Sequence, residues 1–430
     1  MTSNAIRRVR VLLSGVIIGE LIQGRDGGVR WLPDRAWEAG GQVPRLGFDF
    51  LREPGLRKSS QELPPWFENL LPERESALRA RFASIFGLRD GQSFELLNKL
   101  GRELPGAVEV VCPDDSACGD LEGFPDAATA VPLEDSTSPS RRHGDARLSS
   151  LAGVQLKFGM SMVNERLAFG ARSGAREWIV KFPGVYPCLA EIETTTMTWA
   201  AQAGFDVPPH RTVPFDELDG FPQGWAERTQ NVFAIERFDR RSEGSRVHHE
   251  DLCQALGFRP LNKYGDRPNS IRFEGVFRFV HDACGEQSSR EFARRLGLMI
   301  ATGNTDAHLK NWGLLWGDRV RPTLVPCYDI VSTIAFEKMG WDRRGGPRLA
   351  LRFGTTHRFA DVDDKMLDQF SDSTGCSWAS EEISAGIERA RNAYRVLRVT
   401  IPPAMALALS EHWNRVPVLR RYGPLRGSQG

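Results

Sequence analysis

The side chains of this chain that are best suited to chemistry lie in a polar stretch at residues 303–312 (GNTDAHLKNW). Within it, Asp306 precedes Asn311 by five positions. In phosphoryl transfer from ATP, an aspartate accepts the proton of the attacking hydroxyl, and an asparagine farther along the same loop holds Mg²⁺. Another carboxylate, Asp329, follows in the sequence Tyr-Asp-Ile. The pattern predicts a phosphotransferase site with Asp306 as base and with Asn311 and Asp329 as metal ligands.

An aspartate and an asparagine at this spacing also occur in ordinary loops, where both residue types cap turns. Two further features favour the catalytic interpretation. His308 and Lys310 lie in the same stretch, where they could orient Asp306 and neutralise phosphate charge. Asn311 and Asp329 offer the sparse oxygen ligands that Mg²⁺ prefers, with water and phosphate oxygens completing its coordination.

A lysine within an apolar strand is the candidate phosphate contact. Lys181 lies in residues 178–183 (WIVKFP), where a charge is costly unless it meets a partner. ATP phosphates and a carboxylate of the helix expected over residues 190–203 would provide partners. Glu191 and Glu193 are both candidates for that carboxylate, and the sequence does not choose between them. The alternative is an edge strand from which the lysine reaches solvent.

Residues 149–159 are the candidate for a nucleotide-covering loop. They contain only two glycines and match neither a P-loop nor the protein-kinase glycine pattern. Their backbone could still cover phosphates, with Gln155 and Lys157 as donors. Ser150 is a candidate for modification, although a serine in a turn is an equally good interpretation.

The segment 236–239 lies where a connection between two lobes would run. Its backbone could therefore contact adenine, and a surface cluster of ion pairs is the alternative. With this segment, the chain contains a loop, a strand lysine, a helix carboxylate, an inter-lobe connection, a catalytic loop and a metal aspartate, in the order that a two-lobed kinase requires. The joint pattern is more specific than any of its members.

The elements around these residues predict an α+β protein with two lobes, strand-rich before residue 245 and mostly helical after it. The helix before the catalytic loop ends at Gly303, which suits the C′ position; its apolar face carries Phe292, Leu296 and Met299. The expected parts are a small α/β unit (1–112), an acidic, Ser- and Pro-rich linker (113–147), the nucleotide-binding part of the N-terminal lobe (148–245) and the helical C-terminal lobe (246–430).

Composition excludes several classes of protein. A chain of 430 residues suggests two or three packed units, and a net charge of +1 gives no global case for binding nucleic acid or an anionic membrane. The seven cysteines are scattered without metal-ligand spacing, so we expect reduced thiols in the cytoplasm rather than a disulfide framework.

The N-terminal stretch imitates a signal peptide only loosely. Arginines precede an apolar run at residues 11–18, but the run is broken by Ser14 and Gly15 and no cleavage site follows. A hairpin of two short strands around this Ser-Gly turn explains the pattern better. Elsewhere no apolar run approaches the ~20 residues that span a bilayer, so we expect no membrane association.

Many of these stretches resemble the HipA family, the kinase toxins of bacterial type II toxin–antitoxin pairs. The resemblance covers nearly the full chain. The matching stretches are 69–73 (NLLPE), 100–108 (LGRELPGAV), 150–157 (SLAGVQLK), 179–183 (IVKFP), 236–240 (ERFDR), 250–257 (EDLCQALG), 304–311 (NTDAHLKN) and 328–330 (YDI).

This resemblance implies a HipA-like kinase fold and a serine/threonine protein kinase that uses ATP and Mg²⁺. It makes Asp306 the catalytic base and Asn311 and Asp329 the metal ligands, and it places Ser150 at the family's autophosphorylation position, where modification is thought to silence the kinase. The residues that it places around the nucleotide are Ala152, Gly153, Val154, Gln155, Lys157, Lys181, Glu236, Phe238, His308, Lys310, Asn311 and Asp329.

The resemblance also implies partners. Family toxins phosphorylate aminoacyl-tRNA synthetases, notably glutamyl-tRNA synthetase, and are neutralised by a HipB-like helix-turn-helix antitoxin that binds operator DNA. The toxin therefore reaches DNA only through its antitoxin.

A catalytically weak member acting mainly as an antitoxin-bound co-repressor is the alternative. Asp306, Asn311, Asp329 and Lys181 disfavour it, because such a protein has no chemical need for all four. A third possible function is a metal-dependent phosphohydrolase that uses Asp306 and His308. The sequence lacks the additional His or Asp ligands that such a site needs.

Overall fold

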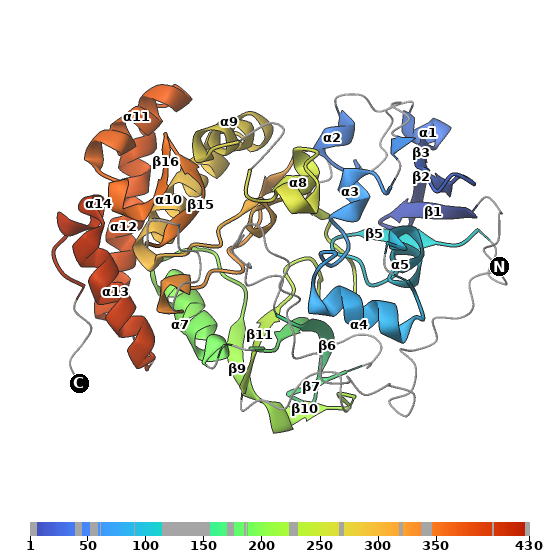
Figure 1. The fold of residues 1–430 in the computed structure, drawn as a ribbon, viewed down its shortest axis with the longest axis horizontal. Helices are drawn as coiled ribbons and strands as arrows, with labels where there is room; N and C mark the ends of the chain where they lie inside the picture. Colours follow the sequence, from blue (N-terminus) through green and yellow to red (C-terminus); the bar gives the residue numbers. More distant parts are fainter. Residues whose placement is uncertain are drawn as a thin grey trace, which may run out of the picture.

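The chain runs from an N-terminal unit, through a strand-rich middle, into a helical C-terminal part, and these lie in this order across the computed structural model (Figure 1). The mixture of sheets and helices confirms the expected α+β class. The structure describes residues 7–38, 45–51, 59–60, 62–89, 91–113, 155–169, 176–184, 186, 188–222, 231–265, 271–317, 321–336, 346–397 and 400–425. The expected linker 113–147 lies outside these residues apart from its first, and the predicted domain boundaries stay predictions.

The N-terminal unit is a sheet covered by short helices. The hairpin expected around Ser14 and Gly15 is present, and both turn residues have positive φ, 52° and 78°. The sheet order is β4-β3-β2-β1-β5. Its strands are β1 (Arg7–Leu13), β2 (Val16–Gln23), β3 (Val29–Pro33), β4 (Ser59–Ser60) and β5 (Val108–Val111), and the helices are α1 (Arg35–Glu38), α2 (Phe48–Leu51), α3 (Pro65–Glu68), α4 (Ala77–Ile85) and α5 (Ser93–Lys99).

The middle of the chain forms a second sheet, of order β10-β7-β6-β8-β11-β9, with helix α7 (Leu189–Gln202) packed against β11 and β9. Its register places Lys157 directly opposite Lys181, so both side chains lie on one face of the sheet. The strands are β6 (Lys157–Val163), β7 (Arg166–Ala168), β8 (Glu177–Lys181), β9 (His210–Pro214), β10 (Leu218–Asp219) and β11 (Asn231–Glu236).

The C-terminal part is built around the long helix α10 (Glu286–Thr302), which ends as expected at Gly303 in the left-handed conformation. Gly297 of α10 and Gly386 of α12 (Ala379–Arg395) allow the two helices to approach, because a Cβ at either position would collide with the backbone of the other helix. The other helices are α8 (Leu252–Ala255), α9 (Phe273–Cys284), α11 (Asp364–Thr374), α13 (Pro403–Arg415) and α14 (Pro417–Arg420).

Short strands and 3₁₀ turns connect these helices. One small sheet has the order β12-β13-β14, and β15 pairs with β16. The strands are β12 (His249–Asp251), β13 (Gly313–Leu315), β14 (Thr323–Leu324), β15 (Arg348–Phe353) and β16 (Thr356–Arg358), and the 3₁₀ turns among the described residues are η2 (Phe215–Glu217), η3 (Pro260–Asn262), η4 (Leu309–Asn311), η5 (Thr333–Ala335) and η6 (Phe359–Asp361).

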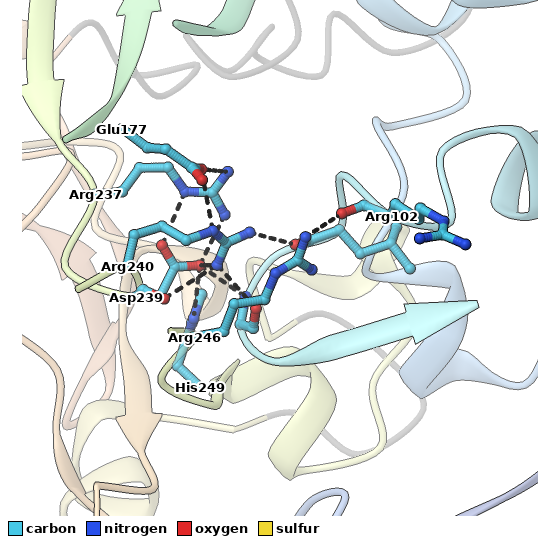
Figure 2. Close-up of polar contacts among 9 residues, drawn as sticks. Arg102, Glu177, Arg237, Asp239, Arg240, Arg246 and His249 are labelled. Atoms are coloured by element: carbon cyan, nitrogen blue, oxygen red, sulfur yellow. Dashed lines mark hydrogen bonds and ion pairs between the residues drawn. The ribbon is translucent and has the colours of Figure 1, made fainter. Parts of the chain in front are cut away.

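A buried ionic network joins the N-terminal unit to the segment that follows β11 (Figure 2). Asp239 accepts hydrogen bonds from the backbone nitrogen of Gly106 at 2.7 Å, from the Arg237 guanidinium at 2.8 and 2.9 Å, and from Arg240 at 3.0 Å. Burial opposes ionisation of this carboxyl group, but Arg237, Arg240 and His249 hold its pKa well below the usual range. The candidate inter-lobe connection is therefore fixed to the N-terminal unit by charge.

Replacing Arg240 with lysine should lower the free energy of unfolding by about 2 kcal/mol, because buried acceptors lose their donors. The guanidinium donates to the carbonyl oxygens of Gly106 at 2.9 Å and Leu104 at 3.1 Å and to the Glu177 carboxylate at 3.1 Å, a set that one ammonium group cannot reproduce. Urea unfolding measures the loss. Arg241→Lys, an exposed neighbour, is the control; equal stability of the two variants would contradict the prediction.

Glu250 of β12 makes a second junction with the N-terminal unit. Its carboxylate accepts from the backbone nitrogen of Phe48 at 2.8 Å, from Trp66 Nε1 at 2.9 Å and from Trp316 Nε1 at 3.2 Å. Complete burial raises the pKa of Glu250 to about 8, although the three N–H donors favour the ionised form. These bonds bring α2 and α3 against the sheet that carries the end of the catalytic loop.

Two expectations from composition can be compared with the structure. Within the described ranges, no helix is both long and apolar enough to cross a bilayer. Cys188, Cys253, Cys284, Cys327 and Cys376 are free. Cys112, however, is disulfide-bonded, which corrects the expectation of reduced thiols for this position. A single bridge needs only two thiols at a suitable separation in space, and the scattered spacing gave no signal of it.

Candidate active site

Lys181 lies at the centre of a buried charge cluster. Its Nζ atom is 2.5 Å from Glu193 Oε1 of α7, and it also contacts the carboxylate of Asp329. The lysine and glutamate side chains are 6% and 0% exposed, whereas that of Asp329 is 26% exposed. Because burial disfavours a positive charge, it lowers the pKa of Lys181, and Glu193 opposes this effect. The cluster joins the middle sheet, α7 and the segment after β14.

The structure chooses between the two candidate helix carboxylates. Glu193 is the partner of Lys181, whereas Glu191 accepts a hydrogen bond from Asn231 Nδ2 at 2.6 Å. The two positions lie two residues apart on α7 and therefore on different faces of the helix. The Lys181–Glu193 pair links a β-strand to a helix, as the pattern of a kinase nucleotide site requires.

The catalytic-loop candidate begins where α10 ends and is held by local hydrogen bonds. Asn304 Oδ1 accepts from the backbone nitrogen of Asp306 at 2.9 Å, and the Thr333 hydroxyl accepts from the backbone nitrogen of Thr305 at 2.6 Å. Farther along, Trp312 Nε1 donates to the carbonyl of Ala307 at 3.1 Å. These hydrogen bonds fix both ends of the loop, and they hold Asp306 in one position between them.

Asp306 is a buried carboxylate with one hydrogen-bond donor pointing at it. The hydroxyl of Tyr264 donates to Asp306 Oδ1 at 2.7 Å. Burial raises the pKa of Asp306 to about 6, against the lowering effects of Lys263 and Tyr264. Lys263 itself pairs with Glu73 of the N-terminal unit at 2.6 Å. A carboxylate whose pKa is raised toward neutrality is a better proton acceptor than an ordinary aspartate.

Asn311 and Asp329 line the same hollow, so the structure brings the two predicted metal ligands together. Asn311 Nδ2 donates to the carbonyl of Asp306 at 2.8 Å, which leaves its side-chain oxygen as the atom available to a metal. Asp329 has a φ of 54°, an uncommon conformation that clusters at functional sites. An amide oxygen and a carboxylate fit Mg²⁺, which keeps several water and phosphate ligands.

His308 and Lys310 are placed differently from each other. His308 is 1% exposed, its Nε2 is 3.8 Å from Asp306 Oδ1, and neither ring nitrogen has a hydrogen-bond partner in the described structure. Burial lowers the pKa of His308 well below its usual value, which favours the neutral ring. Lys310 Nζ donates to the carbonyl of Asn69 at 3.2 Å and lies 4.0 Å from Asp251. Contact of either residue with phosphate stays a prediction.

Two donors predicted in the nucleotide-covering loop lie within the described residues. Gln155 is buried, and its Nε2 has no hydrogen-bond partner there. Lys157 is exposed and lies opposite Lys181. A buried donor without a protein partner, two residues before Lys157 in the chain, is a group that could donate to a phosphate oxygen. The remaining predicted positions of this loop, Ser150, Ala152, Gly153 and Val154, lie outside the described residues.

Glu236 and Phe238 lie on the connection after β11. The backbone nitrogen of Glu236 donates to the carbonyl of Pro209 at 2.8 Å, and the Glu236 Oε2 atom lies 3.7 Å from the guanidinium of Arg176. The ring of Phe238 lies 5.6 Å from that of Tyr328, the residue before Asp329. The connection is therefore in contact with the metal-ligand segment, and the role of both residues beside adenine stays a prediction.

Comparison with known proteins gives the family. Residues 9–111 match the model of the HipA N-terminal domain, and residues 149–398 match that of the HipA-like C-terminal domain. The chain belongs to the HipA family. It is 33% identical to "Putative kinase Y4dM" of Sinorhizobium fredii over 379 aligned residues, and this alignment covers 85% of each chain. It is 28% identical to "Putative kinase Y4mE" of the same organism, covering 86% of both.

A solved structure of another HipA protein shares the fold. A chain of the Shewanella oneidensis MR-1 complex of HipA, HipB and operator DNA matches with a TM-score of 0.71 at 22% sequence identity, covering 95% of each chain. The predicted HipA-like fold is thereby confirmed over nearly the whole chain.

Several residues around Asp306 were not predicted from the sequence. Tyr264 and Lys263 reach it from the turn after η3, and Glu73 reaches Lys263 from the N-terminal unit. In the sequence these residues lie far from the catalytic loop and form no spacing with it. The matched stretch 69–73 contained Glu73, but the resemblance gave it no role. Only the fold brings these groups together.

Proposed function

We propose that the protein is an ATP- and Mg²⁺-dependent serine/threonine protein kinase. The observation that carries this proposal is the buried contact of Lys181 with both Glu193 and Asp329, while Asp329 shares a hollow with Asn311 of the Asp306 loop. A strand lysine paired with a helix carboxylate beside a metal-binding aspartate is the arrangement that protein kinases use for phosphates. The relatives described as kinases support the same activity.

Each residue then has a chemical task. Bound Mg²⁺–ATP supplies the phosphoryl group and neutralises its developing charge. Asp306 orients the acceptor hydroxyl and accepts its proton, Asn311 and Asp329 hold the metal, and Lys181 contacts the phosphates. Lys157 and Gln155 add donors on the same face of the sheet. The backbone around Glu236 and the ring of Phe238 border adenine.

The assignments of Ser150, Ala152, Gly153 and Val154 are supported by the family resemblance alone. These residues would cover the phosphates, and phosphorylation of Ser150 would silence the kinase. Mass spectrometry after incubation with ATP tests the modification. A phosphate on Ser150 that is absent from Asp306→Asn supports self-phosphorylation, and phosphate found only at other positions refutes it.

We further propose that the kinase is a cytoplasmic toxin with a HipB-like helix-turn-helix antitoxin, through which it reaches operator DNA. The solved Shewanella oneidensis HipA, which has this fold, was crystallised with HipB and operator DNA. The proposed target is an aminoacyl-tRNA synthetase. Induced expression in bacteria should arrest growth only with Asp306 intact, with a synthetase among the newly phosphorylated proteins. Equal arrest by Asp306→Asn would show that kinase activity is not the cause.

The pH dependence of catalysis follows from the environment of Asp306. Because the base must be ionised to accept a proton, kcat/KM should fall as the pH drops through about 6, the raised pKa of Asp306. The Tyr264 hydroxyl stabilises the carboxylate, so Tyr264→Phe should raise this pKa and move the acidic limb upward by about one pH unit, the size of one hydrogen bond to a charged group. Tyr394→Phe, in α12, is the control. Superimposable profiles of wild type and Tyr264→Phe would contradict this role.

A further inference from the structure

A cavity lined by three arginines lies outside the candidate active site. Its volume is about 140 Å³, whereas a single water needs only ~10–15 Å³. It lies where the β1–β2 hairpin, the stretch 241–248 and the end of β13 meet, and it shares no lining residue with the site around Asp306. Its polar and aromatic lining includes Ser14, Arg45, Arg241, Arg246, His248 and Trp316, and none of the described residues that line it is acidic.

The arginine charges of this cavity are only partly balanced by acidic side chains of the described residues. Arg45 and Arg241 are exposed, and neither guanidinium forms an ion pair among the described residues. Arg246 donates through Nη2 to the carbonyl of Arg102 (Figure 2), but its Nη1 is buried with no hydrogen-bond partner there. Glu243, on the same turn, accepts from Ser245 Oγ at 2.7 Å and interacts electrostatically with Arg241, but it does not line the cavity.

The backbone holds two of the arginines in place. Arg246 pairs with Arg240 in an antiparallel bridge, and the nitrogen of Arg241 donates to the carbonyl of Ser245 at 2.9 Å. Gly244, with a φ of 83°, closes this turn in a conformation that suits glycine. The two guanidinium groups are therefore carried on one short turn that is anchored to the ionic network around Asp239.

Three like charges that converge on one concavity repel one another, and the buried Nη1 donor of Arg246, which has no hydrogen-bond partner among the described residues, costs free energy. An anion removes both penalties, because guanidinium groups form charge-assisted, often bidentate hydrogen bonds with oxyanions. We propose that this cavity binds a phosphate group, either inorganic phosphate or a phosphomonoester. A dianion with several acceptor oxygens uses three arginines and the Ser14 hydroxyl better than a carboxylate, which carries one charge.

The site is separate from the proposed kinase chemistry, so its test needs no catalysis. Titration calorimetry of the full chain at low salt, without nucleotide, should show one saturable site for inorganic phosphate. Arg241→Gln should weaken binding about tenfold, the size of one charge-assisted hydrogen bond, and Arg45→Gln/Arg241→Gln about a hundredfold. Both side chains are exposed, so the variants should fold. Arg35→Gln, an exposed arginine of α1, is the matched control.

Two further ligands make the result specific. O-Phosphoserine that binds more tightly than inorganic phosphate indicates a phosphorylated side chain as the ligand, and the reverse order indicates the free ion; either supports the site. Acetate that binds as tightly as phosphate would overturn the proposal. It would also be overturned by equal phosphate affinities in Arg45→Gln/Arg241→Gln and Arg35→Gln, or by the absence of saturable binding to the wild type.

Discussion

Asp306→Asn is expected to lower the rate of phosphoryl transfer by about 10²–10⁴-fold, the usual contribution of a general base. Asparagine keeps the size and the hydrogen-bonding oxygen of the side chain but cannot accept a proton. The loop should keep its shape, because Asn304, Thr333 and Trp312 hold it through bonds that do not involve the Asp306 carboxylate. The loss should therefore appear in kcat, with nucleotide affinity nearly unchanged.

Single-turnover kinetics with excess enzyme isolate the chemical step of this variant, and equilibrium binding of a non-hydrolysable ATP analogue shows that the site remains intact. Asp368→Asn changes an exposed aspartate of α11 and is the matched control for a change of charge. If the Asp306 variant transfers phosphate at a rate within a few-fold of the wild-type rate, Asp306 is not the catalytic base. A loss of nucleotide binding equal to the loss of rate would instead assign Asp306 a binding role.

Lys181→Met should both abolish phosphoryl transfer and lower the free energy of unfolding by about 3–5 kcal/mol, the usual cost of leaving a buried charge without its partner. Glu193 is fully buried, and the Lys181 ammonium is its ion-pair partner in the described structure. Without it, two carboxylates, Glu193 and Asp329, would face one another. Methionine fills a similar volume, so the loss would reflect charge rather than a cavity.

A second substitution separates the structural part of this effect from the catalytic part. Lys181→Met/Glu193→Leu removes both buried charges, so it should recover much of the stability that Lys181→Met loses while activity stays absent. Urea unfolding and the labelled-ATP assay are measured on the same preparations. If the urea concentration at the unfolding midpoint is the same for Lys181→Met and the wild type, the Lys181–Glu193 ion pair does not stabilise the fold.

The sequence predicted those parts of the fold that depend on local patterns. The hairpin at Ser14 and Gly15, and the helix that ends at Gly303, follow from turn chemistry and from apolar spacing, and both are present. The strand carrying Lys181 was also predicted. Strand β11 ends at Glu236, and Asp239 and Arg240, which follow it, turn into the ionic network.

Features that depend on contacts distant in sequence could not be predicted. Glu191 and Glu193 both suit the start of a helix, and only the rotation of α7 about its axis decides that Glu193 faces Lys181. The hydrogen bond from Tyr264 to Asp306 and the bond from the Gly106 nitrogen to Asp239 join stretches that share no spacing or composition. Such contacts are set by the packing of whole units.

The most direct test of the central claim is transfer of label from γ-labelled ATP by the purified wild-type chain and by Asp306→Asn, each with Mg²⁺ and a bacterial lysate. A protein kinase should place acid-stable label on serine or threonine residues of a protein, and Asp306→Asn and a sample with chelator should place almost none. Label that the wild type releases only as inorganic phosphate, or protein labelling that persists with Asp306→Asn, would contradict a protein kinase that works through this site.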